Sequence, residues 1–129
     1  MDAKLTPVSD IGQIAITVSD IDQAKAFYHG ILGLKFLFDA GPNLSFLAAG
    51  SVRIMLTTSQ GFGTTGTNSI LYFKVSNVES AWAAITAAGA TPERAPLLTA
   101  KMPDHELWIG FVRDPDGNRV GLMEEKRGL

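Results

Sequence analysis

The 129-residue sequence contains no cysteine. It therefore offers no disulfide, no thiolate ligand for a metal ion and no cysteine nucleophile. It also lacks any apolar run close to the roughly 20 residues that span a bilayer, and its opening stretch, MDAKLTPVSD, lacks the apolar segment of a signal peptide. These absences lead us to expect a cytoplasmic protein with no membrane partner.

An excess of charge of one sign is missing as well. The chain carries 11 basic and 13 acidic side chains, a formal net charge of −2, and its basic residues are scattered. Binding of a nucleic-acid backbone needs a basic patch, so we expect no nucleic-acid partner. What the chain does have is an apolar fraction of 46%, which is typical of an ordered domain with a hydrophobic core.

The first half of the chain predicts one helix among four strands. The stretch GQIAITV alternates as a half-buried strand does, with Ile14 on one face and Gln13 on the other. Asp20 can cap the helix that follows, and Gly33 is its natural stop. The strands predicted in this half are 12–18, 35–39, 44–48 and 52–58.

The second half repeats this order. A strand is predicted at 70–75, Asn77 can cap a second helix, and Gly89 can stop it. Further strands are predicted at 92–98, where the signal is weaker, and at 107–113 and 118–124. Because the stretch VSDI at 18–21 also matches VSNV at 75–78, we interpret the chain as an internal duplication of a βαβββ unit.

The predicted linker between the halves, residues 58–68, contains the pattern GxGxxG from Gly61 to Gly66. This pattern binds a dinucleotide when it opens a helix, because the helix N-terminus then holds the pyrophosphate. Here the strand SILYFKV follows instead. We therefore predict a connector, or a flap over a site, and no nucleotide.

Three stretches carry a family resemblance: IGQIAITVSDIDQAKAFYHGILGLKF, SILYFKVSNVESAWAAI and FVRDPDGNRVGLMEE. Together they resemble the vicinal oxygen chelate superfamily, which includes glyoxalases, bleomycin-resistance proteins and extradiol dioxygenases. The resemblance implies an α+β fold, in which two paired βαβββ modules form curled mixed sheets around a cleft with the helices outside. It implies one domain over residues 1–129, with modules at about 8–57 and 69–126. It also implies a homodimer, and leaves open whether modules pair within or between chains.

The resemblance places the metal-ligand positions of the family at Gln13, Met55, Ile70 and Gly121. A divalent ion that polarises substrate oxygens needs three or four nitrogen or oxygen donors. Only the amide of Gln13 supplies one, since a thioether suits hard ions poorly and the other two positions have no donor. We therefore predict no metal and no cofactor, with a divalent metal held in some other way as the alternative.

The same positions suggest a binding surface. Strand alternation places Arg53 and Tyr72 on the faces of these four residues, and the missing side chain of Gly121 is expected to leave open space for a ligand. A mainly apolar lining with an amide, a guanidinium and a phenol suits a small organic ligand, whose anionic group Arg53 could bind. The alternative is that these residues simply fill the space between sheets. The candidate ligand-binding residues are Gln13, Arg53, Met55, Ile70, Tyr72, Trp108 and Gly121, with Phe46 as a further lining residue.

Catalytic candidates are few. His105 and Glu106 could serve as a general acid or base, although a solvated loop before a strand is the plainer interpretation. Our main hypothesis is a metal-independent small-molecule-binding protein resembling the bleomycin-resistance type. The alternative is a small lyase, isomerase or dioxygenase that acts on a small oxygenated substrate with a divalent metal or with these two residues. A structural dimer with a filled cleft is a third possibility, so whether the chain is an enzyme stays open.

Overall fold

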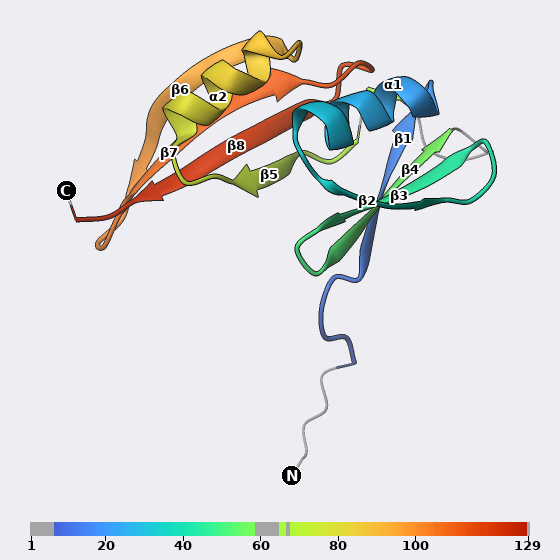
Figure 1. Cartoon of the computed structure of the whole chain (residues 1–129). Coiled ribbons are helices and arrows are strands. Elements are labelled where there is room, and N and C mark those ends of the chain that lie inside the picture. The colour runs from blue at the N-terminus through green and yellow to red at the C-terminus, as the bar shows by residue number, and fades with distance from the viewer. Residues whose placement is uncertain (1–6, 59–64, 67, 129) are drawn as a thin grey trace.

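Two β-sheets, each with a helix across one side, make up the fold (Figure 1). The computed structural model describes residues 7–58, 65–66 and 68–128. Most of the predicted linker, with Gly61 and Gly63, lies outside the described residues. The elements in chain order are β1 (Gln13–Val18), α1 (Ile21–Lys25), η1 (Ala26–Ile31), β2 (Lys35–Asp39), β3 (Leu44–Ala49), β4 (Val52–Thr58), β5 (Leu71–Lys74), α2 (Val78–Ala87), β6 (Thr91–Lys101), β7 (Glu106–Arg113) and β8 (Arg119–Lys126).

The two sheets share one strand order. The first is β1-β4-β3-β2 and the second is β5-β8-β7-β6. In each, the first strand of the module runs parallel to the fourth, while the other pairs are antiparallel. Both sheets are therefore mixed, and the structure confirms the predicted α+β fold with two paired βαβββ modules. None of the helices among the described residues is long and apolar enough to cross a membrane.

The helix starts follow the predicted capping residues. The Oδ1 atom of Asp20 accepts from the backbone N–H of Gln23 at 2.9 Å, and Asn77 caps α2 in the same way. The first helix differs from the prediction because α1 continues as a π-helix, η1. In this wider helix two consecutive residues, Phe27 and Tyr28, are both buried, with their rings edge to face at 4.9 Å between centroids.

One hydrophobic core extends across both modules. Tyr28 and Phe27 from η1 and Leu56 from β4 belong to the same buried cluster as Val112 and Val120 of the second sheet. Each of these side chains is at most 3% exposed. Apolar burial on this scale is the main stabilising contribution to folding, so the two modules stabilise each other.

A buried polar network also joins the modules, at the DPDGN turn between β7 and β8. Asp114, which is 3% exposed, accepts hydrogen bonds from the backbone N–H of Asp116 and from the backbone and side chain of Asn118. The hydroxyl of Tyr28 donates to Asp114 Oδ2 at 2.7 Å. Burial, together with the Asp114 carboxylate, raises the pKa of Tyr28 well above its ordinary value. The turn therefore holds η1 as well as forming a hairpin.

Asn68 makes a second connection between the modules. Its Oδ1 atom accepts from the backbone N–H of Thr17 at 3.1 Å, and its Nδ2 atom donates to the carbonyl of Thr17 at 3.3 Å. The same Nδ2 donates to Asn118 Oδ1 at 2.8 Å. The side-chain amide thus pairs with the outer edge of β1 much as a neighbouring strand would.

Candidate functional site

The predicted ligand-binding residues of the first module, Gln13, Arg53 and Met55, lie on the face of the first sheet that points away from its helix. Gln13 pairs with Arg53 and Ala15 pairs with Met55 in the parallel register of β1 and β4, and Met55 pairs with Phe46 of β3. Paired residues lie on the same face of a sheet. We call this the inner face, and it lies opposite the buried face that packs on the helix.

Side chains on this inner face contact one another. The Nε atom of Arg53 donates to Gln13 Oε1 at 2.7 Å, and Gln13 Nε2 lies 3.6 Å from the Met55 sulfur. The Arg53 guanidinium lies 5.4 Å from the ring centroid of Phe46, which stacks on Phe38 at 4.7 Å. We call these five residues the first-sheet cluster. It combines hydrogen-bonding groups with exposed aromatic surface, as ligand sites do.

The four positions at which the family places metal ligands do not form a metal site here. The oxygen of Gln13 already accepts from the positively charged Arg53, and Ile70 lies just outside β5. Met55 and Gly121 supply no nitrogen or oxygen side-chain donor. Among the described residues, no three His, Cys, Asp or Glu side chains are grouped so that they could hold a metal ion. The donor set therefore does not fit a divalent metal.

Gly121 lies beneath the ring of Tyr72. The two residues are register partners on β8 and β5, and a Cβ atom at Gly121 would come within 2.5 Å of Tyr72 Cδ2. The prediction that the missing side chain leaves open space is therefore wrong, because the tyrosine ring fills it. Aromatic rings commonly cover a glycine on a neighbouring strand, and this contact requires glycine at 121.

The second sheet has an aromatic inner face that the sequence prediction missed. The ring of Tyr72 meets Phe111 edge to face, with 5.8 Å between centroids. Arg94 and Arg119 also contact Phe111, with guanidinium carbons 4.9 and 5.6 Å from its centroid. Counting pairs back from the DPDGN turn would have placed Phe111 opposite Gly121, and this is the signal that could have found it.

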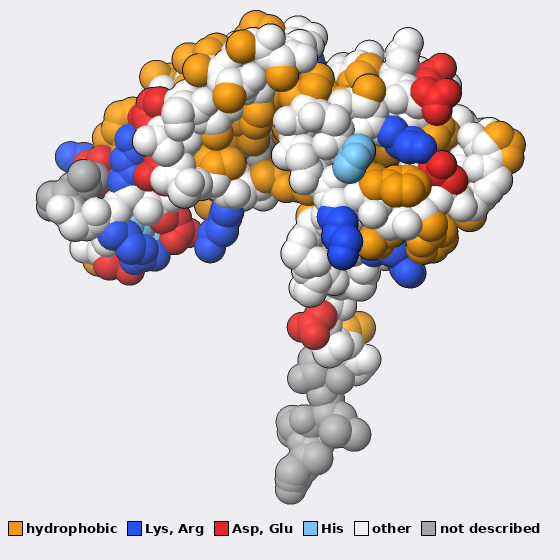
Figure 2. Space-filling view, in the orientation of Figure 1, with side chains coloured by type: hydrophobic (Ala, Val, Ile, Leu, Met, Phe, Trp, Pro, Cys, Tyr) orange, Lys and Arg blue, Asp and Glu red, His pale blue; other side chains and the backbone are white. Residues whose placement is uncertain are grey.

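A groove of about 540 Å³ separates the two sheets, and Tyr72 is part of its lining. Figure 2 shows it as the hollow between the two lobes. Ile14 and Ile54 line the same groove, and both alternate with Gln13 and Arg53 along their strands, so they point to the opposite face of the first sheet. A single chain therefore does not bring Tyr72 to the first-sheet cluster.

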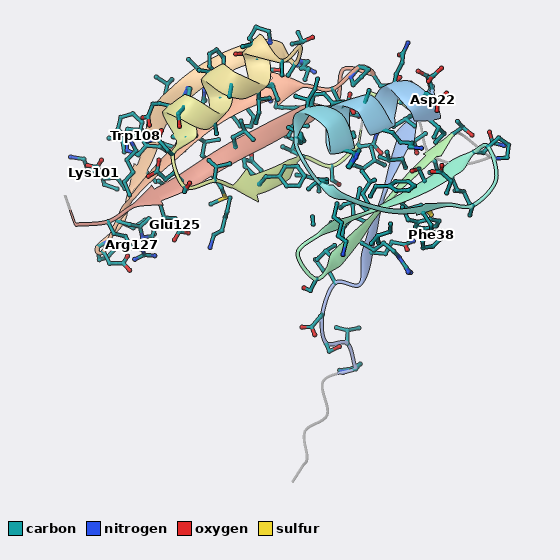
Figure 3. The ribbon with its side chains drawn as sticks, viewed as in Figure 1. Asp22, Phe38, Lys101, Trp108, Glu125 and Arg127 are labelled. Atoms are coloured by element: carbon teal, nitrogen blue, oxygen red, sulfur yellow. The ribbon has the colours of Figure 1, made fainter. Side chains whose placement is uncertain are left out.

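Trp108 lies on the helix side of the second sheet. It pairs with Glu124, whose carboxylate accepts from the backbone N–H of Val78 at the start of α2. The ammonium of Lys126 lies 4.6 Å from the Trp108 ring centroid. Figure 3 shows Trp108 near the end of the second sheet that also carries Arg127. The structure does not bring Trp108 together with Tyr72 and Gly121.

His105 and Glu106 also lie at this end of the sheet. His105 Nδ1 is 2.8 Å from Asp104 Oδ1, and Glu106 accepts from the Trp108 indole at 3.1 Å. Arg127, and after it His105, lower the pKa of Asp104 to about 2. Glu106 is five residues along β7 from Phe111, about 17 Å at the rise of a strand. Neither His105 nor Glu106 therefore reaches the aromatic inner face.

These features define an α+β protein of the paired βαβββ class, with an amide, guanidinium and aromatic rings on its inner faces. The chain belongs to the Glyoxalase/Bleomycin resistance protein/Dioxygenase superfamily, whose family model matches residues 10–122. No curated protein matches the chain in sequence.

Solved structures with the same fold cover nearly the whole chain. A glyoxalase-related enzyme from Fulvimarina pelagi is 20% identical, with a TM-score of 0.72, over 91% of this chain and 88% of that one. An antibiotic-binding protein from Streptomyces sp. is 21% identical, with a TM-score of 0.74, over 95% and 100%. A virulence protein from Salmonella typhimurium is 24% identical, with a TM-score of 0.75, over 92% and 98%. At these identities the likeness shows the fold alone.

Proposed function

We propose that the chain is a metal-independent small-molecule-binding protein of this superfamily. The observation that carries the proposal is the first-sheet cluster, in which Gln13 and Arg53 are hydrogen-bonded to each other beside the rings of Phe46 and Phe38. This arrangement places a cation where a metal site would need donors, and it offers polar groups and ring surface to an organic molecule. The likeness in fold to an antibiotic-binding protein is consistent with this proposal.

Catalysis is not part of the proposal. The enzyme alternative relied on a divalent metal or on His105 with Glu106, and these two residues lie at the far end of the second sheet, in contact with Asp104 and Trp108. The cytoplasmic location and the absence of a nucleic-acid partner stay predictions.

Metal content is the first test. We expect purified protein to contain far less than one equivalent of metal, and we expect zinc, nickel, manganese, iron(II) and magnesium salts to leave its melting temperature unchanged. A library of small aromatic molecules should instead raise the melting temperature, and Arg53→Ala should reduce that shift. A stoichiometric metal whose stabilising effect is lost in Gln13→Ala would contradict the proposal.

We also propose that a second copy of the chain completes the site. Within one chain, Tyr72 lines a groove that meets the first sheet on the face opposite to the first-sheet cluster. One chain alone therefore holds the two halves of the site apart. Apolar side chains are exposed on the outer strands of both sheets, with Phe38 at 46% and Leu97 at 53%. Exposed apolar residues of this kind are typical of an interface between subunits.

Sedimentation analysis tests this arrangement. We expect a mass of twice the 13.8 kDa chain, and we expect Leu97→Asp to shift the population toward the monomer while the circular dichroism spectrum is unchanged. Val8→Asp is the matched control, because Val8 is 75% exposed and lies before β1. A wild-type protein that sediments as a monomer at micromolar concentration would rule out the shared site.

A further inference from the structure

On the inner face of the second sheet, two arginine side chains contact the ring of Phe111. The guanidinium carbons of Arg94 and Arg119 lie 4.9 and 5.6 Å from its centroid, and Tyr72 meets it edge to face. A guanidinium that lies over a ring keeps the N–H groups along its edge available for an anion. We call Tyr72, Arg94, Phe111 and Arg119 the second-sheet cluster.

Backbone and side-chain contacts hold both guanidinium groups in place. Arg94 Nη2 donates to the carbonyl of Ile109 at 2.9 Å, and Arg119 Nε is 2.7 Å from a carboxylate oxygen of Glu93. Holding a donor before the ligand arrives reduces the entropy lost on binding. Both arginines are therefore positioned in advance on the surface beside Tyr72, which is 47% exposed.

The charge on this surface is not balanced. Glu93 forms ion pairs with both Arg119 and Arg113, so one carboxylate serves two guanidinium groups. Within the part of the chain that the structure describes, no carboxylate forms an ion pair with Arg94 or with Arg53 of the first-sheet cluster. The chain as a whole is slightly negative, with a net charge of −2. Among the described residues, the two arginines of the second-sheet cluster therefore have one ion-paired carboxylate between them, that of Glu93, which Arg113 shares.

We propose that the second-sheet cluster binds a small aromatic anion. The negative group, a carboxylate, sulfonate or phenolate, pairs with Arg94 and Arg119, and the aromatic ring lies against Tyr72. Charge-assisted hydrogen bonds from a guanidinium to such a group are among the stronger polar contacts in proteins, and ring contacts add to them. This inference rests on the proposed small-molecule-binding function and names the chemical class of its ligand.

Three probes with one ring system test the charge preference. Calorimetric titration of the purified protein with a naphthoate, the corresponding naphthalenemethanol and the corresponding naphthylmethylamine compares an anion, a neutral molecule and a cation. We expect the naphthoate to bind about tenfold more tightly than the alcohol, and the amine most weakly. Raising the salt concentration should reduce the advantage of the naphthoate.

Variants locate the contact. Arg94→Gln should weaken naphthoate binding about tenfold and leave the alcohol unchanged, whereas Arg94→Lys should retain most of the affinity. Arg127→Gln is the matched control, because Arg127 is an exposed arginine that follows β8 and forms an ion pair with Asp104, away from Phe111. Tyr72→Ala should weaken the naphthoate and the alcohol alike.

The outcomes separate this inference from the proposed function. Equal binding of the three probes with no effect of Arg94→Gln, or tightest binding of the amine, would overturn the anion preference and leave small-molecule binding intact. Binding of none of the three would overturn the aromatic ligand class, while the metal-content test decides the proposed function independently.

Discussion

Asp114→Ala should lower the free energy of unfolding by about 3 to 5 kcal/mol. The carboxylate of Asp114 accepts from two backbone N–H groups, from the amide of Asn118 and from the hydroxyl of Tyr28. Alanine would leave these donors without their partner in a site that is 3% exposed. Each buried donor that loses its acceptor costs about 1 to 3 kcal/mol, and water can replace only some of the lost hydrogen bonds.

Urea denaturation followed by circular dichroism measures this loss. Asp22→Ala is the matched control: Asp22 is an exposed acid in the first turn of α1, where its charge contributes at most about 1 kcal/mol. Asp114→Asn should be less severe than Asp114→Ala, because the amide oxygen can still accept part of the network. A loss below about 1 kcal/mol for Asp114→Ala would show that the turn does not hold the two modules together.

Tyr28 should make the protein sensitive to alkaline pH. Its hydroxyl has a pKa raised above the ordinary value of 10.0, first by burial and then by the neighbouring Asp114. Because the folded state holds the proton more strongly than the unfolded state, this contribution to stability is complete below pH 10.0 and decreases as the pH rises above it. The decrease is about 1.4 kcal/mol per pH unit for one such group.

Tyr28→Phe isolates this effect. Near neutral pH the variant should be less stable than the wild type by about 1 to 2 kcal/mol, because Asp114 loses one donor. Above pH 10.0 the wild type loses the contribution of Tyr28 and the variant does not, so the two unfolding free energies should converge. Guanidinium titrations at a series of pH values measure the difference. A difference that stays constant from neutral to strongly alkaline pH would contradict the role of this hydroxyl.

The order of elements could be predicted from the sequence because it depends on local signals. The caps at Asp20 and Asn77 are such signals, and the structure confirms them. The alternation in β1 holds over its first four residues, whereas Thr17, which strict alternation would expose, is buried and only 7% exposed.

The π-helix was not predicted, because the spacing of Ala24, Phe27 and Tyr28 fits one buried face of a regular α-helix equally well. The structure packs Phe27 and Tyr28 against groups from the other half of the chain, including Asp114. Tertiary contacts of this kind have no local pattern.

The candidate site was only half predictable for a similar reason. Regular alternation on β1 and β4 correctly placed Gln13 with Arg53. On β6 the register shifts between Pro92 and Arg94 and again farther along the strand, so a period of two does not tell which face Arg94 occupies. The space above Gly121 was misjudged because a side chain from another strand fills it, and the sequence does not show side-chain orientation.

The amide of Asn68 affects how fast two chains could exchange modules. Exchange would have to break its contacts with Thr17, the hydrogen bond between Tyr28 and Asp114, and the hydrophobic core that the modules share. Few contacts would remain in a chain opened in this way, so the barrier to exchange should be close to the barrier to global unfolding. A chain that pairs its own modules during folding should therefore keep that pairing for as long as it stays folded.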